Sequence, residues 1–292
     1  MISPLTGRDS LDIAGLERLI ERMIAGGVSG IFALGTTGEA PSLSYRLRRE
    51  LVKRTCSMVA GRVPVLVGIT DTSLIESAHL AQYATDAGAN AVVTSAPFYF
   101  PAGQPELQEY LEQLLPELPL PLMLYNMPAL TKTVFQHDVI SWALEQPNIV
   151  GLKDSSGDLD YFREMEQLIS ANRTDWSLLV GPEELLGDAI LLGADGGVSG
   201  GANLHPSLYV SLYQAARDND HERVRELSAQ VQSLSDELYS VGVHGSAIIK
   251  GIKCALSLLG VCDDFMAAPF HRFEEKDREA VSAILTKAGI TR

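Results

Sequence analysis

Residues 64–88 read PVLVGITDTSLIESAHLAQYATDAG, and this stretch holds one complete strand–helix unit. It begins with proline and then a short aliphatic run interrupted by one glycine, residues 64–69, which is typical of a parallel strand buried on both faces. Ser73 and Glu76 have the spacing of a capping box and predict a helix start, while Gly88 supplies its end. A buried strand followed by an amphipathic helix is the repeating unit of a parallel sheet or barrel.

The same kind of short aliphatic run recurs along the chain at intervals of one helix. Six further runs of this kind are predicted to be strands: residues 30–34, 91–94, 121–125, 149–152, 177–180 and 196–199. An eighth strand is expected at Ile2-Ser3-Pro4-Leu5, which is only a stub. Either the first strand is short, or the natural chain begins upstream of Met1.

These units predict a (β/α)8 TIM barrel with a C-terminal helical extension. The barrel is assigned to residues 1–220 and carries the active site, and the extension is assigned to residues 221–292, whose apolar residues have helical spacing throughout. A doubly wound open sheet is the alternative architecture. The sequence has no Gly-x-Gly-x-x-Gly after its first strand, which disfavours that alternative.

The composition is that of a globular protein, with 292 residues, 46% hydrophobic residues and a net charge of −14. The acidic balance argues against nonspecific nucleic-acid binding, and no apolar run reaches the roughly 18 residues of a membrane span. Three unpatterned cysteines predict a reducing, cytoplasmic location rather than a disulfide framework. The six histidines lack the spacing of a metal site, so we expect no metal.

Lys153 is the most informative residue, because it follows the aliphatic run 149–152 where a strand leaves the barrel core. Active sites of such barrels form at these strand ends. A lysine amine among apolar walls loses the solvation that favours its charged form, and the neutral amine condenses with a carbonyl to give a Schiff base. The protonated imine accepts electrons, so a nearby C–C bond can break or form. The alternative is a solvated lysine just beyond the strand.

Other strand ends supply further candidates for the same site. Gly35-Thr36-Thr37-Gly38-Glu39 offers two hydroxyls and free N–H groups to a carboxylate or phosphate, the alternative being a tight turn that needs glycine. Tyr125 can transfer protons if its hydroxyl reaches the reacting atom, and the commoner alternative is a tyrosine at the edge of the core with one hydrogen bond. Tyr99 is a weaker catalytic candidate in an aromatic loop, and Glu183 is a candidate for binding substrate hydroxyls. The glycine-rich residues 193–201 support a rival interpretation as a phosphate- or flavin-binding barrel.

Three motifs together identify a resemblance that covers essentially the whole chain. Residues 35–39 (GTTGE), 125–128 (YNMP) and 151–154 (GLKD) resemble the dihydrodipicolinate synthase / N-acetylneuraminate lyase family. Such proteins are pyruvate-dependent class I aldolases and lyases on (β/α)8 barrels, and they are usually homotetramers (dimers of dimers). The resemblance implies no metal and no organic cofactor.

The resemblance also implies roles for individual residues. Lys153 would form the Schiff base with pyruvate, and Tyr125 would transfer protons above the imine. Thr36 and Thr37 would hold the carboxylate beside Gly35, with Thr37 also among the catalytic groups. Two more positions that match the family are Tyr99, which would reach into a neighbouring subunit's site, and Val198, whose carbonyl would contact the substrate.

The substrate expectation rests on one departure from the family pattern. Members that make dihydrodipicolinate have an arginine where this chain has Leu130, and an aliphatic side chain cannot pair with a carboxylate. Pro-Ala-Leu-Thr at 128–131 is similar to sialic-acid lyases and 2-keto-3-deoxygluconate aldolases, and Glu183 is similar to a sugar-contacting acid. Gly200 and Lys132 depart from those branches.

We therefore expect an aldolase that cleaves a 2-keto-3-deoxy sugar acid to pyruvate and an aldehyde. N-acetylneuraminate lyase, dihydrodipicolinate synthase and a dehydratase using the same lysine are the alternatives within the family. A non-catalytic barrel that binds 2-oxo acids is the alternative from another class.

Overall fold

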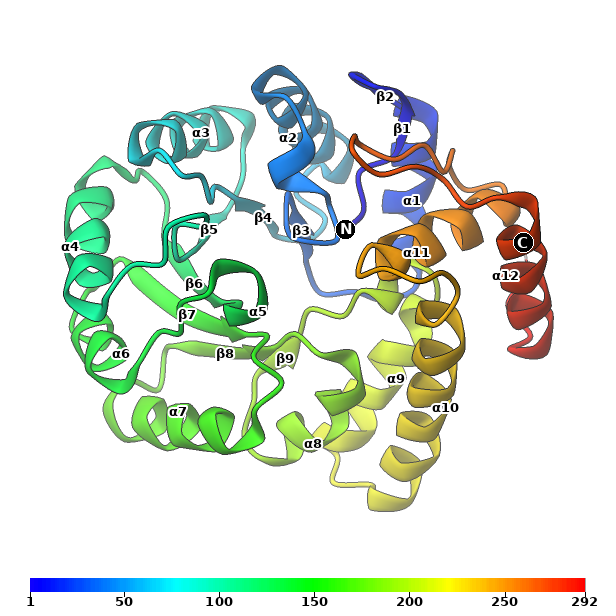
Figure 1. Ribbon diagram of the computed structural model, residues 1–292. Coiled ribbons are helices and arrows are strands. Elements are labelled where there is room, and N and C mark those ends of the chain that lie inside the picture. Colours follow the sequence, from blue (N-terminus) through cyan, green and yellow to red (C-terminus); the bar gives the residue numbers. More distant parts are fainter. Residues whose placement is uncertain (292) are drawn as a thin grey trace.

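A computed structural model describes residues 1–291 and contains a curled sheet of seven parallel strands in sequential order. All seven strands lie where the sequence predicts them, and they form the inner ring of a (β/α)8 barrel (Figure 1). The strands are β3 Ile31–Ala33, β4 Val65–Gly68, β5 Ala91–Ser95, β6 Leu122–Asn126, β7 Ile149–Asp154, β8 Ser177–Val180 and β9 Gly196–Gly197.

The predicted eighth strand at Ile2–Leu5 is wrong as a strand of this sheet. Leu5 begins β1 (Leu5–Gly7), which pairs antiparallel with β2 (Ser10–Leu11) in a separate two-stranded hairpin. The preceding residues still lie beside the barrel: the Met1 nitrogen donates to the Phe32 carbonyl at 2.8 Å, and the Ile2 N–H donates to Asn203 Oδ1 at 2.9 Å. These bonds place residues 1–4 between β3 and the loop that follows β9.

Helices surround the ring of strands (Figure 1). Those of the barrel are α1 Ile13–Ala25, α2 Tyr45–Val59, α3 Leu74–Ala87, α4 Gln104–Leu114, α5 Pro128–Thr131, α6 His137–Leu144, α7 Leu159–Asn172, α8 Leu186–Leu191 and α9 Pro206–Arg217. Four short 3-10 helices accompany them, η1 Ala40–Ser42, η2 Leu115–Glu117, η3 Glu183–Leu185 and η4 Gly201–Asn203.

Helix α3 begins and ends where the sequence predicts, but the capping box is wrong. Gly88 ends the helix with φ +92°, a conformation that glycine adopts without steric cost. The Ser73 hydroxyl makes no capping bond; instead the Ser73 N–H donates to Asp71 Oδ1 at 3.1 Å. Asp71 therefore supplies the acceptor next to the helix start.

The C-terminal helices α10 (His221–Tyr239), α11 (Ala247–Leu258) and α12 (Glu275–Lys287) lie together on one side of the barrel (Figure 1). Their buried side chains belong to the same contiguous core as those of α1 and α9. Among the helices of residues 1–291, none is both long enough and apolar enough to cross a membrane.

Candidate active site

Lys153 and Tyr125 are register partners on the adjacent strands β7 and β6, close to the carboxyl end of each. Directly paired residues on neighbouring strands point to the same face of a sheet. The Lys153 side chain is 6% exposed, and its Nζ lies 3.7 Å from the centre of the Tyr125 ring and 5.8 Å from that of Phe32. The amine is thus buried against two aromatic faces at the position that the sequence predicts for the reactive lysine.

Thr36 completes a group of three candidate side chains. It lies in the turn that follows β3, and its Oγ1 is 3.2 Å from the Tyr125 hydroxyl oxygen. Backbone bonds close this turn, because the Gly38 N–H donates to the Gly35 carbonyl and the Glu39 N–H to that of Thr36, both at 3.0 Å. The structure therefore brings three predicted site residues together from strands that are far apart in sequence.

The neighbouring side chains lower the pKa of the Tyr125 phenol. Burial acts to raise its pKa, but the Lys153 ammonium and hydrogen bonds with Thr36, Lys153 and Ser155 outweigh burial and lower it from the ordinary tyrosine value. A phenol whose pKa is lowered gives up and regains a proton more readily near neutral pH. Tyr125 is thus suited to move protons beside the lysine amine.

The residues that follow the lysine and the tyrosine in sequence hold the two strand ends together. Asn126 Nδ2 donates to Asp154 Oδ1 at 2.7 Å, and the Ser156 hydroxyl donates to Asp154 Oδ2 at 2.8 Å. Burial raises the pKa of the Asp154 carboxyl, against the effect of these bonds. Asn126 and Asp154 belong to the motifs quoted from the sequence, but the sequence alone indicates no role for them.

A cavity of about 420 Å³ opens beside Tyr125 and Thr36 at the carboxyl ends of the strands. Its walls are mostly apolar, with hydroxyl groups between them. It is lined by Phe32, Leu34, Gly35, Thr36, Glu39, Ala40, Pro41, Ser42, Gly68, Thr70, Ser95, Phe98, Tyr125, Met127, Leu130, Thr131, Gly245, Ser246, Ile249 and Phe270. Four of these residues come from the C-terminal part of the chain, which the sequence did not predict at the site: Gly245, Ser246, Ile249 and Phe270.

Two more predicted site residues are half-buried and follow strands of the barrel. Thr37 follows Thr36 in the turn, and Val198 follows β9, with its N–H donating to the Val180 carbonyl at 2.8 Å.

Leu130 lines the outer part of the cavity and is 55% exposed. Lys132 has φ +62°, so it occupies a left-handed position that favours glycine, and its amine donates to the Ala129 carbonyl at 2.7 Å.

Glu183 is engaged away from the cavity. Its Oε1 accepts hydrogen bonds from the hydroxyls of Tyr209 and Tyr239, each at 2.8 Å, and its Oε2 accepts from the Gly201 N–H at 2.6 Å. Burial raises the pKa of this carboxyl, while these three bonds oppose that effect. Both oxygens thus have partners within the chain, and Glu183 fixes the loop after β9 instead of facing the cavity.

Tyr99 does not join the group around Lys153 within this chain. It is 84% exposed in the loop after β5 and has φ +83°, and its ring packs edge-to-face on Phe100 at 5.0 Å.

Residues 1–288 of the chain match the model of one protein family, the dihydrodipicolinate synthetase family. The chain belongs to this family. It is accordingly an enzyme, a lyase of the pyruvate-dependent class I aldolase type.

Relatives within the family carry different names. The chain is 30% identical to the probable 2-dehydro-3-deoxy-D-pentonate aldolase YjhH of Escherichia coli, covering 96% of this chain and 93% of that protein. It is also 30% identical to the 4-hydroxy-tetrahydrodipicolinate synthase of Aromatoleum aromaticum, covering 99% and 97%.

Two solved structures of the family superpose on nearly the whole chain. The dihydrodipicolinate synthase of Bacteroides thetaiotaomicron has a TM-score of 0.96 at 53% identity, covering 98% of this chain and 96% of that one. YagE of Escherichia coli, solved in complex with pyruvate, has a TM-score of 0.93 at 28% identity, covering 99% and 96%.

Proposed function

We propose that this enzyme reversibly cleaves a 2-keto-3-deoxy sugar acid to pyruvate and an uncharged hydroxyaldehyde, through a Schiff base on Lys153. The observation that carries this proposal is the lining of the cavity. Among its residues in the described chain, the only charged side chain is Glu39, which is already paired with Lys253. Leu130 adds an aliphatic wall at the rim.

The chemistry of this lining favours a neutral, hydroxylated substrate tail. Binding a second carboxylate in an apolar cavity requires a cation, best an arginine that pairs with both oxygens. The hydroxyls of the cavity wall suit the hydroxyls of a sugar chain instead, because each can both donate and accept. The lining residues that supply them, besides Thr36 and Tyr125, are Ser42, Thr70, Ser95, Thr131 and Ser246.

In the proposed reaction Lys153 forms the covalent intermediate, Tyr125 transfers protons, and two threonines hold these groups and the substrate in place. The Lys153 amine attacks the C2 carbonyl, and loss of water gives the imine. Tyr125 gives its proton to the departing water as the protonated imine forms. It then takes the proton of the C4 hydroxyl while the C3–C4 bond breaks, the electrons pass into the protonated imine, and the aldehyde leaves. Protonation of the enamine at C3 and hydrolysis release pyruvate and restore the amine. Thr36 orients the Tyr125 hydroxyl, and Thr36 and Thr37 hold the carboxylate.

Dihydrodipicolinate synthesis is the second candidate, because relatives of 53% and 30% identity carry that name. It would use the same imine on Lys153 but would condense pyruvate with an aldehyde that bears a carboxylate. N-acetylneuraminate lyase activity remains the third candidate.

The resemblance to the family and one exposed aromatic loop both support a proposal for the oligomeric state. Tyr99 and Phe100 are 84% and 79% exposed, and we propose that they are covered by a second copy of the chain in a homotetramer. The three cysteines are free and buried, which favours a reducing compartment such as the cytoplasm.

The test is borohydride reduction in the presence of pyruvate, with peptide mapping, followed by an aldehyde panel. We expect a reduced pyruvate adduct on Lys153, and faster turnover with glyceraldehyde or glycolaldehyde than with aspartate semialdehyde. No adduct would contradict the aldolase mechanism, and a preference for aspartate semialdehyde would favour the second candidate.

A further inference from the structure

A buried ion pair lies directly behind the turn that carries Thr36. Lys253 of α11 and Glu39 form this pair, and both side chains are fully buried. Glu39 Oε2 also accepts the Ala267 N–H at 2.8 Å, and Lys253 Nζ donates to the Phe265 carbonyl at 2.7 Å. The pair therefore joins three segments: the turn after β3, helix α11, and the loop that connects α11 to α12.

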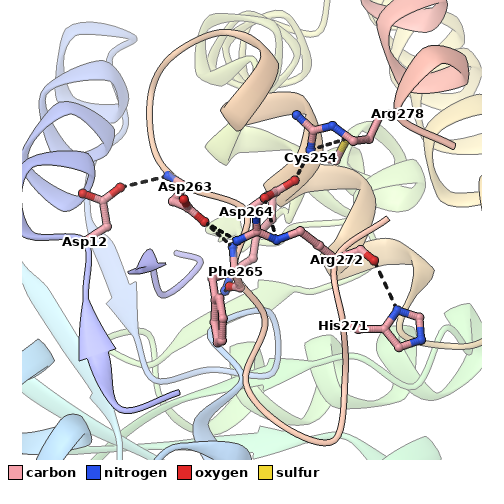
Figure 2. Close-up of polar contacts among 9 residues, drawn as sticks. Asp12, Cys254, Asp263, Asp264, Phe265, His271, Arg272 and Arg278 are labelled. Atoms are coloured by element: carbon pink, nitrogen blue, oxygen red, sulfur yellow. Dashed lines mark hydrogen bonds and ion pairs between the residues drawn. The ribbon is translucent and has the colours of Figure 1, made fainter. Parts of the chain in front are cut away.

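That loop, residues 261–274, is itself anchored at several points, and we call it the strap. The Asp263 N–H donates to Asp12, at the start of α1, at 2.8 Å, and Arg272 donates to Asp263 at 2.9 Å (Figure 2). Asp264 forms an ion pair with Arg278 of α12.

A backbone bridge between Leu5 and Asp264 fixes the same part of the strap to the N-terminal hairpin. The strap thus presents the Phe265 carbonyl and the Ala267 N–H to the ion pair from a fixed position.

Glu39 is linked to the catalytic group through one short path. It has φ +56°, a left-handed conformation that a residue with a side chain rarely adopts, and it ends the turn. Its N–H donates to the Thr36 carbonyl at 3.0 Å, and the Thr36 hydroxyl lies 3.2 Å from that of Tyr125. A shift of Glu39 would therefore move Thr36 relative to Tyr125.

Burying two charges is costly, and apolar side chains of the same volume often stabilise a protein as well or better. Burial lowers the pKa of Lys253, while the Glu39 carboxylate opposes that effect. A charge pair at this place gives what apolar contacts do not, namely a fixed direction for both partners. Both Glu39 oxygens are engaged by Lys253 and Ala267, so Glu39 is not free to bind substrate although it borders the cavity.

We propose that Glu39 and Lys253 are positioning residues that hold the Thr36 hydroxyl at Tyr125 during the reaction. The proposal rests on the proposed function, because it assigns the pair to proton transfer at the Schiff base. It makes the C-terminal extension part of the catalytic apparatus.

The experiment compares Lys253→Met and Glu39→Gln with the wild type by borohydride trapping with saturating pyruvate. The end point of trapping counts competent sites, and the turnover number is expressed per trapped site. Lys250→Met is the matched control, because Lys250 is a second buried lysine of α11 whose amine approaches His271 instead of Glu39. We expect Lys253→Met and Glu39→Gln to lower kcat per trapped site roughly tenfold to a hundredfold, with the KM for pyruvate within about twofold. The control should match the wild type.

A double-variant cycle with Thr36→Val tests the path itself. If the pair acts through Thr36, adding Lys253→Met to Thr36→Val lowers kcat less than about twofold further, because the positioned hydroxyl is already absent. A full additional loss would overturn the proposal. So would a loss of trapped sites with an unchanged kcat per site, which is the signature of a purely structural pair.

Two other failures can be distinguished from a failure of the positioning role: a variant that does not fold, and a proposed function that is wrong. Where a single variant does not fold, Glu39→Gln combined with Lys253→Met removes both charges and undergoes the same measurements and the same cycle. A wild-type enzyme that gives no adduct would contradict the proposed function. A wild-type adduct with unchanged kcat in the variants would overturn the positioning role alone.

Discussion

At the scale of the residue, the site depends on the register of two neighbouring strands. Lys153 and Tyr125 are paired across β6 and β7, and the amine lies 3.7 Å from the centre of the tyrosine ring. Because strand ends hold the functional groups of such barrels, sequence position made both residues candidates, and the resemblance to the family then supplied their expected roles. Glu39 and Lys253 could not be selected in this way. Glu39 belongs to the quoted turn motif and Lys253 to a helix near the end of the chain, and only the folded chain brings them together.

Lys153→Ala should abolish both the pyruvate adduct and turnover while leaving the fold intact. The variant lacks the amine that forms the imine, and loss of a covalent nucleophile costs on the order of 10⁴-fold or more in kcat. Turnover assays and circular dichroism check this expectation. Lys132→Ala is the control, because the exposed Lys132 amine bonds the Ala129 carbonyl, and this variant should remain active. Wild-type rates in Lys153→Ala would contradict the mechanism.

Thr36→Val should change the pH dependence of kcat. The Thr36 hydrogen bond lowers the pKa of Tyr125, so its removal raises that pKa. The limb of the pH–rate profile that reports ionisation of Tyr125 should then move to higher pH, with kcat reduced roughly tenfold to a hundredfold. Thr37→Val is the comparison: it should raise the KM for pyruvate and leave this limb in place. If the limb does not move in Thr36→Val, the Thr36 hydroxyl does not influence the ionisation of Tyr125.

At the scale of the element, the aliphatic runs predicted all seven strands of the sheet because parallel strands are buried on both faces. The stub at Ile2–Leu5 failed as a strand because the Ile2 N–H bonds to the Asn203 side chain, the Pro4 carbonyl accepts the Asp12 N–H, and Pro4 has no N–H to give to a ladder. The Ser73 capping box failed because the Asp71 carboxylate accepts the Ser73 N–H. Local spacing thus gives the elements, while partners from elsewhere decide their ends.

The short helix α5 presents Leu130 to the cavity rim, and this position should set the charge of the accepted aldehyde. Leu130→Arg adds a cation that can pair with a carboxylate, so the kcat/KM ratio of aspartate semialdehyde to glyceraldehyde should rise about tenfold or more. Leu130→Gln is the matched control, since it adds polarity without charge. Steady-state kinetics with both aldehydes measure the ratio. An equal ratio in all three enzymes would show that Leu130 does not govern specificity.

At the scale of the whole molecule, one loop carries an unexplained strain. Tyr99 has φ +83° and is 84% exposed, although a bulky side chain in the left-handed region costs on the order of 1–2 kcal/mol. Such strain persists where it serves a function, and an exposed aromatic pair is typical of an interface. No pattern in the sequence predicts the backbone conformation of this loop; only the likeness to the family indicated a neighbouring subunit.

Tyr99→Asp combined with Phe100→Asp should therefore dissociate the assembly. Two carboxylates at the centre of the proposed apolar contact would be buried without partners, and the sedimentation coefficient should fall below that of a tetramer of 31.6 kDa chains. Ile75→Asp, which places the same charge at a 58% exposed position of α3, is the control and should leave the assembly unchanged. A wild-type chain that sediments as a monomer would contradict the proposed tetramer.

Complementation between inactive variants tests whether Tyr99 acts in a neighbouring site. Suppose each site combines Lys153 of one copy with Tyr99 of another. A mixed pair of Lys153→Ala and Tyr99→Phe chains then contains one site with both groups and one with neither. Because closed pairs exchange the same surface, random reassembly of equal amounts should restore about a quarter of the wild-type activity. If each chain instead supplied its own complete site, mixing would add nothing to the sum of the two separate activities, and the exposure of Tyr99 would need another cause.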